Sequence, residues 1–104
     1  MANICDNEFL ISFECKETGI KISKKLEKLF DKCLDGEITY ADEKIIEGYF
    51  DSRWSFPMHI FEDFFDEFND NIYMRCLSTE YGCGYIAMNI YRDNHWEHEQ
   101  TFIL

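Results

Sequence analysis

The sequence predicts one α+β domain in which two helices cover one face of an antiparallel sheet. Three observations lead to this fold class. Several short segments alternate apolar with polar residues, as strands with one buried face do. Two other segments repeat apolar residues at helical spacing. The chain has 104 residues, 46% of them hydrophobic and 17% aromatic, which is enough to bury one core.

The first predicted elements are a strand over residues 8–15 and a helix that follows it. Phe9, Ile11, Phe13 and Cys15 alternate with residues that are mostly polar. Thr18 and Gly19 are expected to break the chain before the helix. The apolar side of this helix is predicted to consist of Ile22, Leu26, Leu29, Phe30 and Cys33, and the outward side of Lys24, Lys25, Lys28 and Lys32. Gly36 is expected to end the helix.

The central part predicts two strands and a second helix. The strands are expected over residues 37–40 and 44–54, with Gly48 marking a β-bulge and Trp54 closing one end of the core. Ser55 is predicted to cap the helix and Pro57 to lie in its first turn. The apolar stripe of this helix is expected to consist of Met58, Phe61, Phe64, Phe65 and Phe68.

The last part predicts a hairpin and a short final strand. Residues 72–77 and 85–92 are expected to pair as antiparallel strands around Gly82, Cys83 and Gly84, and residues 101–104 to form the final strand. The resulting order is strand, helix, strand, strand, helix, strand and an extra strand. This order predicts that residues 1–104 form a single ferredoxin-like sandwich, with four to five strands and both helices on one face.

The negative charge of the chain is concentrated after its first third. The formal net charge is −11, and residues 1–34 carry six acids and six bases whereas residues 35–104 carry fifteen acids and four bases. Such a surface repels phosphate, so that direct binding to nucleic acid is not expected. No apolar run is long enough for a membrane span. The charge favours a basic protein or nucleoprotein partner.

Carboxylates spaced along one face can imitate the phosphates of a duplex and occupy a basic channel. Exposed aromatic residues such as Tyr49, Tyr73, Tyr85 and Tyr91 are expected to anchor such an interface. The predicted partner-binding residues are Asp51, Glu62, Asp63, Asp66, Glu67, Asp70, Glu80, Tyr81, Asp93, Trp96 and Glu97.

Cysteine and histidine patterns argue against a metal site or a thiol enzyme. The cysteines are five in number, without zinc-knuckle spacing, and are expected to be free thiols of a cytosolic protein without a signal peptide. His95 and His98 are three residues apart, a chelating spacing on a helix but not in a strand, where they would point to different sides. Neither a catalytic motif nor a cofactor is predicted.

Two stretches of the sequence resemble the Api92-like or YubB-like ferredoxin-like family of phage and plasmid proteins. They are the opening Met-Ala-Asn-Ile-Cys-Asp and the segment Arg-Trp-Ser-Phe-Pro at residues 53–57, followed by Glu80-Tyr81-Gly82. Ile4 replaces the usual tryptophan of the family and Phe56 the first proline of its Trp-Ser-Pro-Pro segment. The resemblance implies a ferredoxin-like fold and a mobile-element source, and it implies no enzymatic activity.

The leading hypothesis is an acidic inhibitor of a bacterial defence complex, with a CRISPR effector as the expected target, that binds without catalysis in the host cytosol. A second hypothesis is a structural or self-assembling module, with a homodimer as its form, in which a sheet edge and aromatic residues make the contact. A third is a metal-dependent enzyme that uses His95 and His98.

Overall fold

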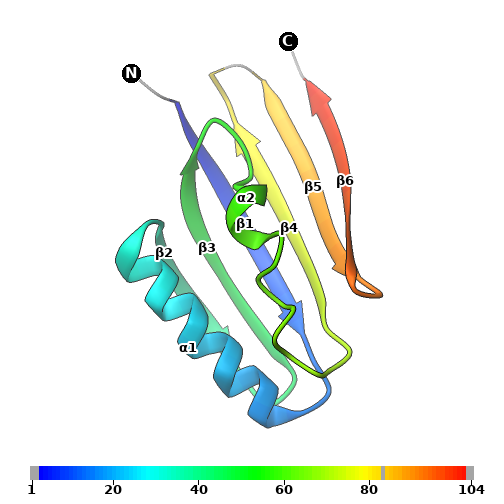
Figure 1. Ribbon diagram of the computed structural model, residues 1–104. Coiled ribbons are helices and arrows are strands. Elements are labelled where there is room, and N and C mark those ends of the chain that lie inside the picture. The colour runs from blue at the N-terminus through cyan, green and yellow to red at the C-terminus, as the bar shows by residue number, and fades with distance from the viewer. Residues whose placement is uncertain (1–2, 83, 103–104) are drawn as a thin grey trace.

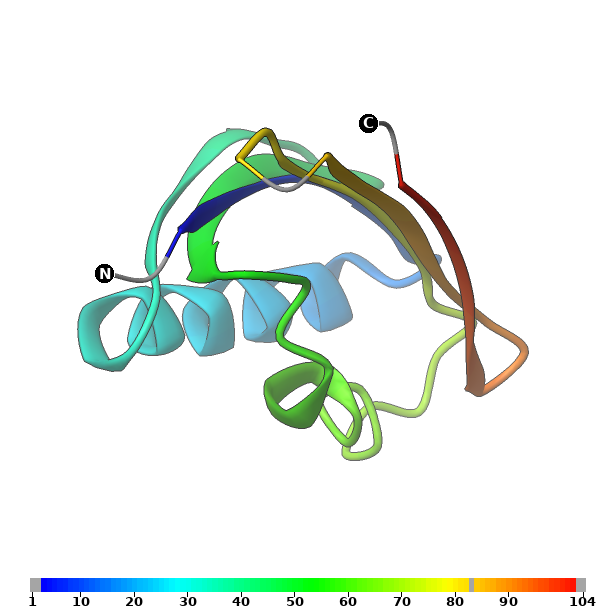
Figure 2. The ribbon, with the colours of Figure 1, turned by 90° about the horizontal axis from the view of Figure 1, so that it is seen from above.

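The protein was analysed as a computed structural model that describes residues 3–82 and 84–102. Six antiparallel strands form one sheet, in the order β2-β3-β1-β4-β5-β6 (Figure 1). The elements along the chain are β1 (Ile4–Ser12), α1 (Lys16–Lys32), β2 (Asp35–Ala41), β3 (Ile45–Arg53), α2 (Met58–Phe61), β4 (Tyr73–Glu80), β5 (Tyr85–Arg92) and β6 (His95–Phe102). The sheet arches over both helices, so that they cover its concave face and leave the convex face open (Figure 2).

The predicted ferredoxin-like sandwich with four to five strands is wrong. The sheet has six strands, and the second helix is a single turn of four residues. The extra strand comes from the hairpin of β5 and β6, whose turn residues Asp93 and Asn94 have φ angles of 53° and 63°. Two residues with positive φ match the right-handed twist of the strands, and Asp and Asn tolerate this conformation. This turn starts β6 at His95 rather than at residue 101.

The predicted second helix is replaced by successive turns. After Phe61 the chain makes hydrogen bonds from Phe64 N to Phe61 O and from Phe68 N to Phe65 O, three residues back in each case. Ser55 does not cap α2, because Pro57 occupies the N-cap position without a side-chain hydrogen bond. A segment that lacks a cap and is rich in phenylalanine and aspartate has little helical tendency of its own.

The turns after α2 still bury the aromatic residues that the helix was expected to bury. Phe61 stacks on Phe50 of β3 with ring centroids 5.4 Å apart, and neither side chain is exposed. Phe64 and Phe65 are also buried. Lys25 of α1 donates a hydrogen bond to Phe64 O, and its ammonium group lies 4.4 Å from the centroid of the Phe64 ring. The segment therefore covers the centre of the sheet and contacts α1 at its side.

The two tryptophans have the opposite roles to those predicted. Trp54, expected to close the core, is 50% exposed and has a φ angle of 70°. Trp96, expected to anchor a partner, packs on Phe56 and Tyr91 at centroid distances of 5.5 and 5.3 Å, and its Nε1 donates to Phe61 O at 3.1 Å. The cause is β6, whose inward-facing positions include Trp96 because Trp96 lies opposite the buried Tyr91.

Three glycines have roles that differ from those predicted. Gly19 does not break the chain but lies in α1, where a Cβ atom would come within 2.2 Å of the Phe13 ring. Gly36 lies in β2, and α1 ends before it. The bulge predicted at Gly48 lies instead in the neighbouring strand: Ile38 and Tyr40 of β2 pair with the consecutive residues Gly48 and Glu47 of β3, so the extra residue is Thr39.

The first strand and the cysteines also differ in part from the prediction. β1 begins at Ile4 and ends at Ser12, four residues earlier than expected at its start. Cys15 and Cys33, expected to be buried, are exposed, whereas Cys5 and Cys76 are buried. All four are free thiols, as predicted, and Cys83 lies outside the described residues.

Replacement of Trp96 by alanine should lower the free energy of unfolding by about 3 kcal/mol, because the indole contacts four aromatic rings and bonds Phe61 O. The matched variant Trp54→Ala should change it by less than about 0.5 kcal/mol. Urea denaturation followed by circular dichroism measures both. Equal losses in the two variants would contradict the assignment of Trp96 to the core.

Candidate functional site

The uncovered face of the sheet carries six carboxylates on three neighbouring strands. Burial alternates along β1 and β3, so that Cys5, Asn7 and Phe9 face the helices and the residues between them face outward. The six carboxylates are Asp6 and Glu8 of β1, Asp35 and Glu37 of β2, and Glu47 and Asp51 of β3. They are called the acidic face below.

The register of the strands brings three of these groups into one row. Asp51 lies opposite Asp6 on one side and opposite Asp35 on the other. Burial, followed by the charges of Asp6 and Asp35, raises the pKa of Asp51 above its ordinary value. Among residues 3–82 and 84–102, no carboxylate of the acidic face has an ion-pair partner. The face therefore presents negative charge that the described residues leave uncompensated.

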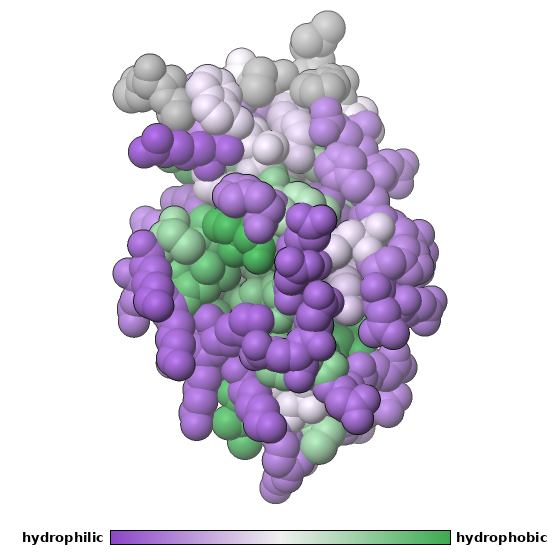
Figure 3. Space-filling view, in the orientation of Figure 1, coloured by the Kyte–Doolittle hydropathy of each residue, from purple (hydrophilic) through white to green (hydrophobic). Residues whose placement is uncertain are grey.

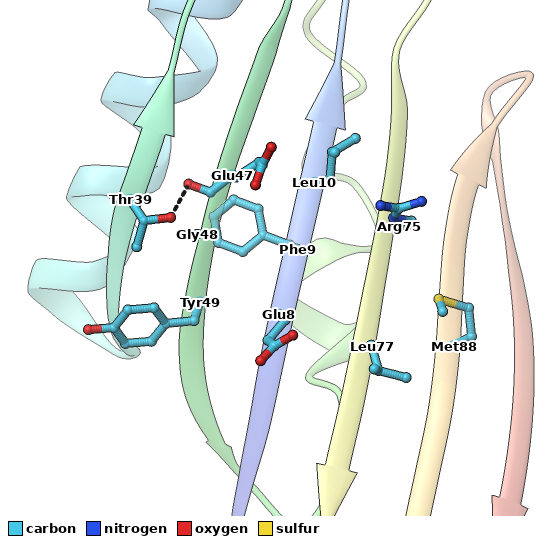
Figure 4. Close-up of a pocket in the computed structure, with 10 residues that line it drawn as sticks. All are labelled: Glu8, Phe9, Leu10, Thr39, Glu47, Gly48, Tyr49, Arg75, Leu77 and Met88. Atoms are coloured by element: carbon cyan, nitrogen blue, oxygen red, sulfur yellow. Dashed lines mark hydrogen bonds between the residues drawn. The ribbon is translucent and has the colours of Figure 1, made fainter.

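A shallow depression of about 590 Å³ lies next to this row, over β1, β3 and β4. Figure 4 shows Glu8 and Glu47 at its acidic side and Leu10, Leu77 and Met88 across β1, β4 and β5. Tyr49 lines the depression, is 44% exposed and donates a hydrogen bond from its hydroxyl to Glu37 at 2.9 Å. This bond to a carboxylate raises the pKa of Tyr49. Carboxylates, aliphatic side chains and one phenol thus border the same hollow.

The acids predicted after Pro57 lie on the other side of the molecule. Glu62, Asp63, Asp66 and Glu67 are exposed on the turn segment that covers the concave face. Glu67 pairs with Lys25, with Oε2 3.5 Å from Nζ. On this side, hydrophilic residues surround an area of hydrophobic ones (Figure 3). These four acids are therefore close to one another but separate from the acidic face.

Asp70 and Glu80 have structural contacts. Asp70 accepts hydrogen bonds from Glu14 N at 3.2 Å and Cys15 N at 3.0 Å, which join the start of α1 to the segment before β4. Burial alone would raise the pKa of Asp70, but these hydrogen bonds lower the pKa overall. Glu80 is only 3% exposed and accepts a hydrogen bond from Gly82 N at 2.7 Å.

The remaining predicted positions are scattered. Tyr81 is 82% exposed beyond the end of β4, and Asp93 lies in the turn between β5 and β6. Glu97 faces outward on β6 and binds Arg92. Tyr85 and Tyr91 were expected to be exposed, and this is wrong because both are 5% exposed. Asp51 is the predicted residue that lies on the acidic face.

Five carboxylates of the acidic face were missed by the sequence prediction. The signal was present in β1 and β2, where Asp6 and Glu8, and likewise Asp35 and Glu37, are two residues apart and therefore share one side of a strand. The first strand was expected to start at residue 8, which left Asp6 outside the sheet, whereas β1 begins at Ile4.

In the described ranges, His95 and His98 do not form part of a metal site, and burial keeps the Cys76 thiol protonated. His95 faces the outer side of β6, near Glu97, whereas His98 faces the inner side and bonds Asn89 Oδ1. Within residues 3–82 and 84–102, no group of three or more His, Cys, Asp or Glu side chains is placed to hold a metal ion. Burial raises the pKa of Cys76 to about 12, which keeps this thiol protonated.

None of the helices in the described part of the chain is both long and apolar enough to cross a membrane. In comparisons with known proteins, no family model, curated protein or solved structure matches the chain. The resemblance to the Api92-like family therefore stays a prediction.

The variant Asp51→Asn should be more stable than the wild type at pH 7. The pKa of Asp51 is raised in the folded protein, so its stabilising effect is present below the ordinary value of 3.8 and is lost as the pH rises through the folded pKa. The advantage of the variant should therefore vanish below about pH 4. Thermal unfolding at pH 3.5 and 7 measures it.

The control Asp42→Asn should behave in the opposite way. Hydrogen bonds from Lys44 N, the Tyr40 hydroxyl and Ile45 N lower the pKa of Asp42, so its stabilising effect is present at pH 7 and is lost as the pH falls through the folded pKa. This variant should be less stable than the wild type at pH 7. The same sign for both variants would contradict the electrostatic description of the row.

Proposed function

We propose that this protein is a non-catalytic binding protein whose acidic face docks on a basic surface of another protein, where it takes the place of nucleic acid. The observation that carries the proposal is the set of six uncompensated carboxylates on one uncovered sheet face. A rigid sheet holds these groups in place before binding, so that little ordering entropy is lost on association.

The spacing of the carboxylates suits a surface that binds phosphates. Neighbouring strands lie about 4.8 Å apart, and alternate residues of one strand about 6.8 Å apart. One strand of DNA carries a phosphate about every 3.4 Å along the helix axis. The carboxylates of the acidic face have a comparable density, so they can meet the lysines and arginines of a nucleic-acid channel as phosphates do. Opposite potentials of this kind speed association and suppress wrong partners.

The apolar border of the depression supplies the part of the interface that excludes water. Leu77 is 38% exposed and Tyr49 44% exposed, and both lie opposite Glu8 of the acidic face. Interfaces gain most of their binding energy from a few such side chains, with tyrosine enriched among them. Arg75 lines the same depression and has no ion-pair partner in the described ranges. It offers the partner one cationic contact within an acidic surface.

Binding rather than catalysis fits this geometry. The carboxylates lie on an open convex face where water screens them, whereas acid–base catalysis depends on a few groups held at defined positions in a site that excludes water. The resemblance to mobile-element proteins narrows the proposed partner to a bacterial defence complex, with a CRISPR effector as the first candidate.

Charge reversal tests the proposed surface. The triple variant Glu8→Lys, Glu37→Lys, Glu47→Lys should lower the association rate with a captured basic partner by roughly 10- to 1,000-fold, because it removes the steering field. The partner is captured from nuclease-treated bacterial lysate on the immobilised wild-type chain, eluted with salt and purified. Surface plasmon resonance then gives the rates with and without a competing 20-base-pair DNA duplex.

The control is the triple variant Glu62→Lys, Asp63→Lys, Asp66→Lys, which changes the net charge by the same amount on the covered side of the molecule. It should retain the association rate to within a few-fold, which separates a local interface from the effect of net charge. The proposal fails if both variants bind alike, or if the duplex and the chain bind the partner together.

A further inference from the structure

Among residues 3–82 and 84–102, β6 is paired on one side only, so it is an open edge of the sheet. It pairs with β5 in unbroken register from Arg92–His95 to Tyr85–Phe102, and it is the terminal strand of the sheet. Its eight residues include no lysine, proline or bulge, the features by which natural edges avoid further pairing. The opposite edge, β2, is interrupted by the bulge near Thr39. The two edges therefore differ in their capacity to accept another strand.

The turn of the hairpin fixes which backbone groups of β6 face outward. In a two-residue hairpin, the residues that flank the turn form a hydrogen-bonded pair, and such pairs alternate along the ladder with pairs that are not bonded. Arg92 and His95 flank the turn, so the residues of β6 directed away from β5 are Trp96, His98 and Gln100. Their N–H and C=O groups present a regular ladder to a further strand.

The side chains of the second half of β6 leave room for such a strand. His98, Glu99, Gln100 and Thr101 are all exposed, although they alternate between the two faces of the sheet. Both faces of this segment are thus accessible.

The charge of β6 selects the occupant. Glu97 and Glu99 face the convex side, where Glu97 is paired with Arg92 of β5 and Glu99 has no ion-pair partner among the described residues. Asp93 lies in the adjoining turn, and β6 carries no lysine or arginine. Antiparallel pairing of two copies centred on His98 would set Glu97 of each copy opposite Glu99 of the other, and like charges directly opposite are unfavourable. An extended segment with lysine or arginine at alternate positions would instead meet these carboxylates.

We propose that β6 binds an extended basic segment of a partner protein, which adds to the sheet as a seventh strand. Main-chain hydrogen bonds to Trp96, His98 and Gln100 hold the segment, and the carboxylate of Glu99, which has no ion-pair partner among the described residues, selects its charge. In the sheet, β4 and β5 separate β6 from the three strands that carry the acidic face. The proposal for β6 does not depend on the proposed mimicry of nucleic acid.

A synthetic peptide tests the edge directly. The probe is a nine-residue peptide in which lysine alternates with valine and threonine, and the control peptide has proline at two central positions. Binding of the probe should slow hydrogen exchange at the amides of Trp96, His98 and Gln100, measured by NMR, and leave β2 unchanged. Protection at β2, or the same protection with the control peptide, would overturn the proposal.

A pair of variants separates the backbone from the side chain. Gln100→Pro removes an N–H that faces away from β5 and should weaken peptide binding by roughly tenfold, whereas Gln100→Ala keeps the N–H and should bind within about twofold. Equal affinities of the two variants would refute strand addition. So would a dimer of the free chain through β6 in sedimentation, because a second copy would then be the occupant.

The acidic-face variant Glu8→Lys, Glu37→Lys, Glu47→Lys should still show peptide protection at β6. If this variant loses partner capture but keeps peptide binding, the acidic face binds the partner and β6 binds the peptide independently. The result therefore distinguishes the two proposals. Loss of β6 protection in this correctly folded variant would place the peptide on the acidic face and refute the edge site.

Discussion

The structure depends on the packing of Phe61 against Phe50 at the centre of the concave face. Both side chains are fully buried, and Phe56, Phe64 and Trp96 surround them. The aromatic cluster is supplied by a turn segment rather than by a long helix, and it provides the covering layer for the strands that α1 does not reach. Burial on this scale stabilises the fold through the concave face of the sheet, so the convex face does not have to be apolar.

One-sided burial is the origin of the acidic face. Each strand directs alternate side chains to the core, so the residues between them are free to carry charge. In β1, β2 and β3 six of these residues are aspartate or glutamate, whose mutual repulsion is tolerated because they remain in contact with water. Burial, together with the charges of Asp6 and Asp35, raises the pKa of Asp51, which shows a cost of placing this carboxylate in the row. An unfavourable arrangement of charges that persists at a surface is consistent with a binding role, because perturbed pKa values cluster at functional sites.

Much of the strand pattern could be predicted from the sequence, whereas the layer above the sheet could not. The alternation in Phe9, Ile11 and Phe13 and the strand over residues 85–92 correspond to the structure. The helix predicted after Pro57 ends at Phe61. The apolar spacing of this segment fits both a helix and a series of turns, and tertiary contacts decided between them. The acids near Asp63 were assigned to one face of a long helix, whereas the structure places them on turns that follow α2.

The most direct measurement is carboxylate footprinting of the chain, free and bound to its captured partner. Each aspartate and glutamate is labelled with a carbodiimide and an amine, and mass spectrometry gives the extent of labelling. The account predicts that Asp6, Glu8, Asp35, Glu37 and Glu47 are protected in the complex while Glu62 and Asp63 are labelled as before. Protection of Glu62 and Asp63 with an unchanged acidic face would contradict it.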